Sequence, residues 1–160
     1  MGKTEIFAEP GTSTIDITRE FDAPRDLVFK AWTDPDLLVQ WLGGTRLKME
    51  IDTYEVRDGG RWRYIHTDDD GSEYAFHGVF HGTPTPDRMT QTFEYEGWPG
   101  QVSLESIVME ERDGKTVMRN HAVYQSVEAR DGMVSSGMEE GMNAGFDQLD
   151  QLLGTLTAGS

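Results

Sequence analysis

Four histidines are the side chains of this sequence best suited to acid–base or metal chemistry near neutral pH. They are His66, His77, His81 and His121. No two of them have the helical spacing or the tight clustering of a zinc site. The sequence also contains no cysteine, so we expect neither a metal site nor a disulfide. Together with Tyr64 and Glu105, the imidazoles would serve general acid–base chemistry only inside a cavity that shifts their pKa values.

Motifs for nucleophilic catalysis and for nucleotide binding are missing from the sequence. It has no Gly-x-Ser-x-Gly elbow, no phosphate-binding loop and no dinucleotide-binding fingerprint. Gly59-Gly60 fits a hairpin turn instead of a phosphate site. We therefore predict no catalytic residue and no cofactor, which favours binding over catalysis.

A larger group of aromatic and thioether side chains would suit a cavity for an apolar, ring-shaped ligand. In the run 61–67, alternation places Trp62, Tyr64 and His66 on one face, which we expect to point inward because the arginines between them suit solvent. The predicted lining consists of Trp41, Trp62, Tyr64, His66, His77, Phe80, Phe93, Tyr95, His121, Met138, Met142 and Phe146. A closed core in which these side chains leave no room is the alternative. For strand 115–125 both faces stay open: either Met118, Asn120 and Tyr124 point inward, or Val117, Arg119 and His121 do.

Hydrophobic periodicity gives the elements that must position these residues. A strand at 13–21 precedes two short helices, which begin at Pro24 and Pro35 and end at Gly43-Gly44. Turn sequences then separate six runs of period two, and the predicted strands are about 46–56, 61–67, 73–83, 88–96, 101–111 and 115–125. One amphipathic helix begins near Asp131 or Val134 and ends at about Leu156. Glycines at 137, 141 and 145 leave one stripe of this helix without side chains. Either another backbone packs closely against that stripe, or open space is left beside it.

This order predicts an α+β helix-grip fold. About seven antiparallel strands form a meander that curves around one long C-terminal helix. One helix cannot fill so wide a concavity, so we expect an internal cavity. We assign residues 1–12 to a flexible leader, 13–156 to a single domain and 157–160 to a tail.

Four segments carry a family resemblance: REFDAPRDLVFKAWTDPDLLVQWLGG at 19–44, VRDGGRWRY at 56–64, FHGVF at 76–80 and DGMVSSGMEEGMNAGFDQLDQLL at 131–153. Together they resemble the SRPBCC superfamily of START-like and polyketide-cyclase-like helix-grip proteins, in the branch of the activator of heat-shock-protein-90 ATPase. The resemblance implies a ligand-holding architecture but not a particular reaction. Members often carry an acidic residue after the HGVF-like segment, where this chain has His81-Gly82-Thr83.

The charge balance restricts the partners. The chain has 160 residues, with 14 Lys and Arg against 29 Asp and Glu, a net charge of −15. Such a field repels phosphate backbones and anionic lipids, so we expect no nucleic-acid or membrane partner. No run approaches the roughly 20 apolar residues of a membrane span, and the first residues lack a secretory signal pattern. A cytoplasmic monomer or homodimer is the expectation.

Three functions remain at this stage. The first is binding of a small hydrophobic or aromatic molecule for transport, sensing or sequestration. The second is a cyclase- or aromatase-like enzyme that acts on a polyketide-like substrate. The third is a protein-interaction module similar to the domain of the chaperone ATPase activator.

Overall fold

The computed structural model describes residues 4–44 and 47–158. Within these ranges the chain forms eight strands and four helices. In chain order they are β1 (Glu5–Phe7), β2 (Thr14–Phe21), α1 (Arg25–Thr33), α2 (Pro35–Leu38), β3 (Lys48–Tyr54), β4 (Arg61–Thr67), β5 (Glu73–Val79), β6 (Arg88–Tyr95), β7 (Val102–Arg112), β8 (Lys115–Val123), α3 (Val127–Ser135) and α4 (Met138–Ala158). Residue 46 of the predicted strand 46–56 lies outside the described residues, as do residues 1–3 and 159–160 of the predicted leader and tail.

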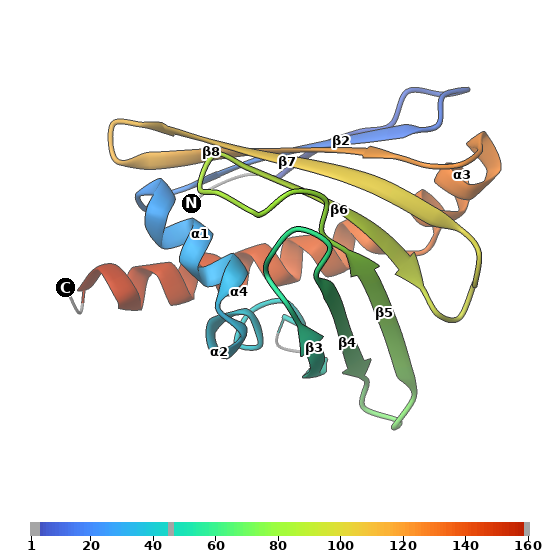
Figure 1. Cartoon of the computed structure of the whole chain (residues 1–160), viewed down its shortest axis with the longest axis horizontal. Helices are drawn as coiled ribbons and strands as arrows, with labels where there is room; N and C mark the ends of the chain where they lie inside the picture. Colours follow the sequence, from blue (N-terminus) through green and yellow to red (C-terminus); the bar gives the residue numbers. More distant parts are fainter. Residues whose placement is uncertain (1–3, 45–46, 159–160) are drawn as a thin grey trace.

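All the strands join in one antiparallel sheet with the order β1-β2-β8-β7-β6-β5-β4-β3. The run from β3 to β8 is the predicted meander, and β2 closes against β8 (Figure 1). The sheet has one strand more than predicted because Glu5–Phe7, within the predicted leader, pairs with β2 and places Ile6 opposite Ile17. A run of three residues is too short to show a periodicity.

The C-terminal helical region is divided into two helices where the sequence predicts one. Ser126 caps α3 by accepting a hydrogen bond from the amide of Ala129 at 3.0 Å. Gly137, with φ of +86°, follows the end of α3, and α4 begins at the next residue. A left-handed residue after the last helical turn is a common way to end a helix. The break leaves α4 as the long helix of the fold.

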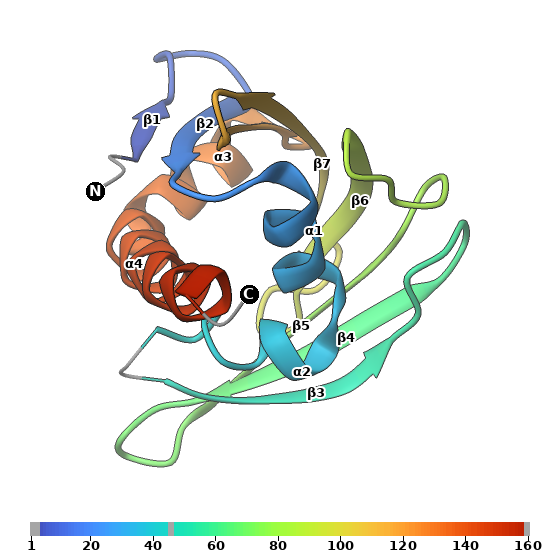
Figure 2. The ribbon, with the colours of Figure 1, turned by 90° about the vertical axis from the view of Figure 1, so that its left-hand side faces the viewer.

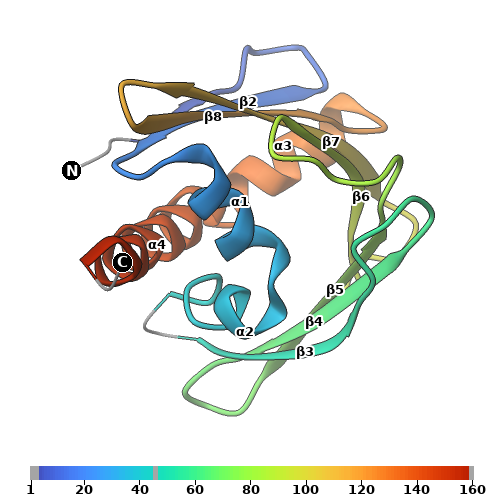
Figure 3. The ribbon, with the colours of Figure 1, turned by 60° about the vertical axis from the view of Figure 1, so that its left-hand side comes forward.

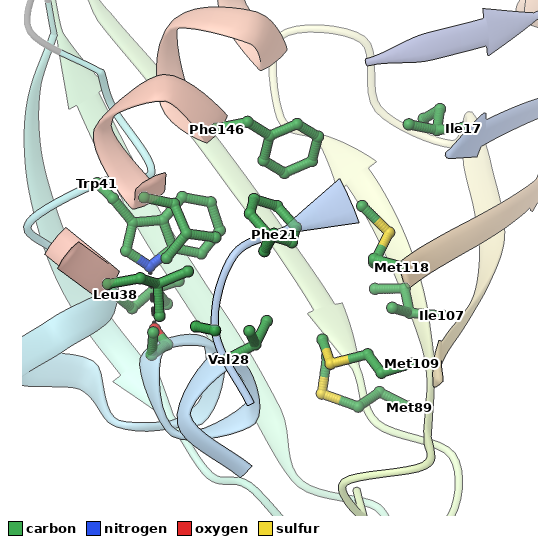
Figure 4. Packing of buried hydrophobic residues seen from close by; sticks show 14 of the residues in the cluster. Ile17, Phe21, Val28, Leu38, Trp41, Met89, Ile107, Met109, Met118 and Phe146 are labelled. Carbon is green, nitrogen blue, oxygen red and sulfur yellow. Dashed lines mark hydrogen bonds between the residues drawn. The ribbon is translucent and has the colours of Figure 1, made fainter. Parts of the chain in front are cut away.

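The sheet curves around α4, and α1 and α2 occupy one side of the concavity (Figures 2 and 3). Next to these short helices the interior is closely packed (Figure 4). Phe146 of α4 meets the ring of Phe21 at 5.5 Å between centroids and that of Trp41 at 6.3 Å. The Trp41 indole nitrogen donates to the carbonyl oxygen of Ala31 at 3.0 Å, so the buried N–H is paired. The region where α4 packs against α1 and α2 is therefore part of the hydrophobic core.

The glycines of α4 show both of the predicted arrangements: another backbone packs closely at one of them, and open space is left at another. A side chain at Gly145 would lie 3.2 Å from the carbonyl oxygen of Leu42, so the backbone packs closely there. A side chain at Gly141 would meet no heavy atom within 4 Å. Close packing therefore begins around residue 145 and does not extend to the first turn of α4.

Candidate functional site

Five aromatic rings line the concave face of the sheet on β4, β5 and β6. We call this set the aromatic wall: Trp62, Tyr64, Phe76, Phe93 and Tyr95. The register of β4, β5 and β6 aligns them, since Tyr64 lies opposite Phe76 and Phe76 lies opposite Tyr95. Ring centroids of neighbours are 5.1 to 5.8 Å apart. The result is a continuous apolar surface.

The inward direction of strand 61–67 is confirmed. Trp62, Tyr64 and His66 share the concave face, and Arg63 points to the other side, where it pairs with Glu96. Trp62 lies opposite Gly78, where a Cβ would clash with the carbonyl oxygen of Thr92 and would lie 2.6 Å from the indole nitrogen. The close approach of the neighbouring backbone and of the indole together explain this glycine.

Most of the aromatic wall remains partly accessible. Trp62 is buried, with an exposed fraction of 2%, whereas Tyr64, Phe76, Phe93 and Tyr95 are half-buried. On α4 the side chains of Met138 and Met142 are half-buried as well and pack at the edge of the core. Accessible aromatic and thioether groups on an inward face are what a binding surface for an apolar molecule requires.

A polar cluster lies beside the wall on the same face. Glu105 of β7 accepts hydrogen bonds from the side-chain amides of Gln91 and Asn120, each at 3.2 Å. Burial raises the pKa of the Glu105 carboxyl above its ordinary value, and the two amide hydrogen bonds counteract part of that rise. The sequence names Glu105 as an acid–base candidate, but its partners depend on the register of three strands. We call Gln91, Glu105 and Asn120 the carboxyl–amide cluster.

Burial also shifts the pKa values of several other polar groups of the concave face. Burial lowers the pKa of His66 to about 4, so the imidazole is neutral at pH 7, and its Nδ1 has no hydrogen-bond partner. The pKa values of Tyr54, Tyr64 and Tyr124 are raised by burial. The charge of Glu105 adds to the rise of the pKa at Tyr64 and Tyr124. Burial settles the open choice for strand 115–125: Met118 and Asn120 are buried, whereas Arg119 and His121 are exposed.

Two histidines of the predicted lining lie on the outer face of the sheet, and this part of the prediction is wrong. His77 lies opposite Arg63, and its ring nitrogens contact Glu96 at 2.9 Å and Glu94 at 3.4 Å. His121 is exposed and pairs with Asp16 at 2.6 Å. On the outer face both imidazoles have carboxylate partners within hydrogen-bonding or ion-pairing distance.

The remaining predicted residues divide between core and accessible face. Trp41, Phe80 and Phe146 are buried in packed surroundings, with exposed fractions of 1%, 1% and 6%. Phe93, Tyr95, Met138 and Met142 belong to the accessible part described above. Phe76 was missed, although its place in the predicted strand 73–83, paired with strand 61–67, would have put it opposite Tyr64.

Two hollows of the surface lie elsewhere. One, of about 430 Å³, is on the outer face of β2, β7 and β8 and is lined by the Asp16–His121 pair, Ser106, Val108 and Arg119 among others. The other, of about 240 Å³, lies between the loop at 8–11 and α3, beside Arg130 and Val134. Of the predicted lining, only His121 contacts either hollow.

In the described ranges no helix has the length and apolar character needed to cross a bilayer. The same ranges contain no group of three or more His, Asp or Glu side chains arranged to hold a metal ion.

Several solved structures share this fold over nearly the whole chain. A protein from Rhodobacter sphaeroides has 25% sequence identity and a TM-score of 0.86, with 96% of this chain and 99% of that chain covered. Protein Ms6760 from Mycobacterium smegmatis has 27% identity and a TM-score of 0.85, with 94% and 96% covered. A protein from Arthrobacter aurescens has 26% identity and a TM-score of 0.85, with 94% and 91% covered. No curated protein sequence matches the chain.

Residues 22–154 match the family model described as activator of Hsp90 ATPase homolog 1-like protein. The match extends from the end of β2 through most of α4 and includes the aromatic wall and the carboxyl–amide cluster. It thus covers well over half of the sequence, in agreement with the helix-grip architecture. This chain therefore belongs to the activator of Hsp90 ATPase homolog 1-like protein family.

Proposed function

We propose that this protein binds a small apolar or aromatic molecule against the concave face of its sheet, between the aromatic wall and α4. One observation carries the proposal: four rings of the wall stay half-buried on an inward face, while the adjacent core closes completely. Exposed aromatic surface that no side chain of the chain covers is stabilised when a guest removes it from water.

The chemistry of the opposite side supports the same function. Met138 and Met142 of α4 are half-buried, and flexible thioethers adapt to ligands of different shapes. The indole nitrogen of Trp62 and Nδ1 of His66 are buried without partners. Unpaired buried polar atoms cost free energy, and a ligand or water that reaches them recovers part of it.

The setting of the protein is part of the proposal. We place the binding unit at residues 13–156, in a cytoplasmic monomer or homodimer without a nucleic-acid or membrane partner. The net charge of −15 supports the last two exclusions because it opposes anionic surfaces.

Fluorescence titration with the neutral apolar probe N-phenyl-1-naphthylamine tests the proposal. Phe76→Ala removes a central ring of the wall and should weaken binding about tenfold or more. Ile65→Ala is the matched control, because Ile65 is half-buried on the outer face of β4, the strand that carries Tyr64 and His66. It should leave the dissociation constant unchanged.

A filling variant provides a second test. Met142→Trp places a larger side chain at a half-buried position of α4, on the side where we propose that the ligand lies, so the folded protein should lose probe binding. Circular dichroism and the melting temperature report whether each variant keeps its fold. Absence of binding by the unmodified protein, or equal losses in Phe76→Ala and Ile65→Ala, would refute the proposed function.

A further inference from the structure

The carboxyl–amide cluster contains one buried acceptor that has no donor, the Oδ1 atom of Asn120. Both amides use a side-chain N–H to bond the Glu105 carboxylate, one to each oxygen. Asn120 has an exposed fraction of only 9%, and its Oδ1 is buried without a partner. A buried acceptor without a donor is costly, so this place favours a guest that brings N–H groups.

No cation of the described residues neutralises Glu105, which takes part in none of their ion pairs. Arg19, which lies on the same face of the sheet, is already bound to Asp147 and Asp150. His66 is held neutral by its burial. The described part of the interior therefore offers a carboxylate and no positive charge to match it.

Aromatic side chains share the concave face with this carboxylate. Phe93 belongs to the strand pair that carries Gln91 and Glu105, and it lies opposite Ser103. The charge of Glu105 also contributes to the raised pKa values of Tyr64 and Tyr124. Faces of aromatic rings attract organic cations, most strongly where water is excluded. A carboxylate together with ring faces is complementary to an ammonium group, whereas an anionic head would meet only repulsion.

We infer that the ligand is an amphiphilic amine, with an apolar body on the aromatic wall and a protonated primary or secondary amine bound by Glu105 and the Asn120 Oδ1. The inference rests on the proposed function, because the wall must first hold the apolar body. It adds the charge and hydrogen-bonding character of the head.

Three probes with the same ring system separate the possibilities: 2-naphthylmethylamine, 2-naphthalenemethanol and 2-naphthoic acid, measured by isothermal titration calorimetry at pH 7. The amine should bind about tenfold or more tightly than the alcohol, and the acid more weakly than both. Glu105→Gln should remove the preference for the amine and leave alcohol binding unchanged. Glu110→Gln, on the opposite face of the same strand, is the matched control and should keep the preference.

The outcomes distinguish the two proposals. Binding of all three probes with similar affinity, or an amine preference that survives Glu105→Gln, overturns this inference and leaves the proposed function standing. Binding of none of them by the unmodified protein counts against both. Should Glu105→Gln fail to fold, the carboxyl ¹³C resonance of Glu105 in the unmodified protein gives the answer, because it must shift on addition of the amine and not of the alcohol.

Discussion

Burial shifts the pKa values of His66 and Glu105 in opposite directions, and both shifts favour the neutral form. At His66 nothing in the surroundings offsets the burial of the imidazole, whereas at Glu105 two amide hydrogen bonds counteract part of the effect of burial on the pKa of the carboxyl. The two groups therefore play different roles at pH 7. The neutral His66 lies beside the aromatic wall, while Glu105 is a polar group on the concave face.

The depressed pKa of His66 makes stability depend on pH. The folded-state pKa is about 4, against about 6.5 in an unfolded chain. Between these values the unfolded state binds more protons, so the stabilisation present above pH 6.5 is lost as the pH falls toward 4. The loss from this one residue should reach about 3 kcal/mol at most.

Urea denaturation at pH 7 and pH 4.5 measures this effect. His66→Gln cannot gain a proton, so the variant should lose less stability than the unmodified protein over the same interval. Equal losses in the two proteins would show that the pKa of His66 is the same in the folded and unfolded states, which would contradict the depressed folded-state value. NMR of the His66 ring protons gives the folded-state pKa directly.

Alternation along a strand predicted side-chain directions only where one face was clearly unsuited to the interior. In β4 the two arginines decided the direction of Trp62, Tyr64 and His66 correctly. In β5 the neighbours Phe76 and His77 are both plausible inside, and the partners that hold His77 outside, Glu94 and Glu96, come from the next strand. The carboxyl–amide cluster likewise depends on side chains from three strands, which a single-strand pattern does not contain.

At the scale of elements, two glycines in the helical region should respond oppositely to the same substitution. Gly137 has φ of +86°, which an L side chain rarely adopts, so Gly137→Ala should cost about 1 to 2 kcal/mol. Gly141 lies within α4 with open space around it, so Gly141→Ala should stabilise by up to about 1 kcal/mol. Thermal unfolding of both variants tests this. Shifts of the same sign would contradict the assigned break between α3 and α4.

A buried arginine connects α4 to β2, the strand next to the edge of the sheet. Arg19 of β2 has an exposed fraction of 2%, bonds Thr4 at 2.7 Å and pairs with Asp147 and Asp150. Its guanidinium also lies over the ring of Phe146, 5.8 Å from the centroid. Because Arg19 is buried between β2 and α4, the stability of this contact depends on whether its guanidinium charge remains paired with a carboxylate.

The two aspartates should not contribute equally to this connection. Asp150 is largely buried, with 19% of its side chain exposed, and Asp147 is 63% exposed. Asp150→Asn should therefore cost about 3 kcal/mol because it leaves a buried cation poorly paired, and Asp147→Asn less than about 1 kcal/mol. Urea denaturation of the two variants compares them. An equal cost would mean that the guanidinium is more hydrated than its burial indicates.

The elements themselves were largely predictable. Period-two runs separated by Asp-Gly and Pro-containing turns gave six strands of the meander and the correct order of pairing. The break at Gly137 was not predicted, because the apolar spacing of Met138 and Met142 continues through α4 without showing where the helix starts. The strand Glu5–Phe7 depends on pairing with β2 and has no signal of its own.

At the scale of the whole molecule, the excess of acidic residues acts on folding and binding together. A net charge of −15 on one domain makes the folded state repel itself, and it also attracts cations toward the molecule. The surface ion pairs, such as Arg119 with Glu110, offset only part of this repulsion because exposed pairs contribute little. The effect of added salt on the free energy of unfolding should therefore show whether repulsion or ion pairing dominates.

The free energy of unfolding should therefore rise with salt at neutral pH. Raising NaCl from about 10 mM to about 500 mM shortens the screening length from roughly 30 Å to a few ångströms, which removes most of the repulsion between distant carboxylates. The urea midpoint at pH 7 should increase accordingly. Near the sequence isoelectric point of about 4.5 the net charge vanishes, so the same salt change should have little effect there. A salt response of equal size at both pH values would mean that salt acts through apolar burial, and the acidic surface would then have no measurable part in stability.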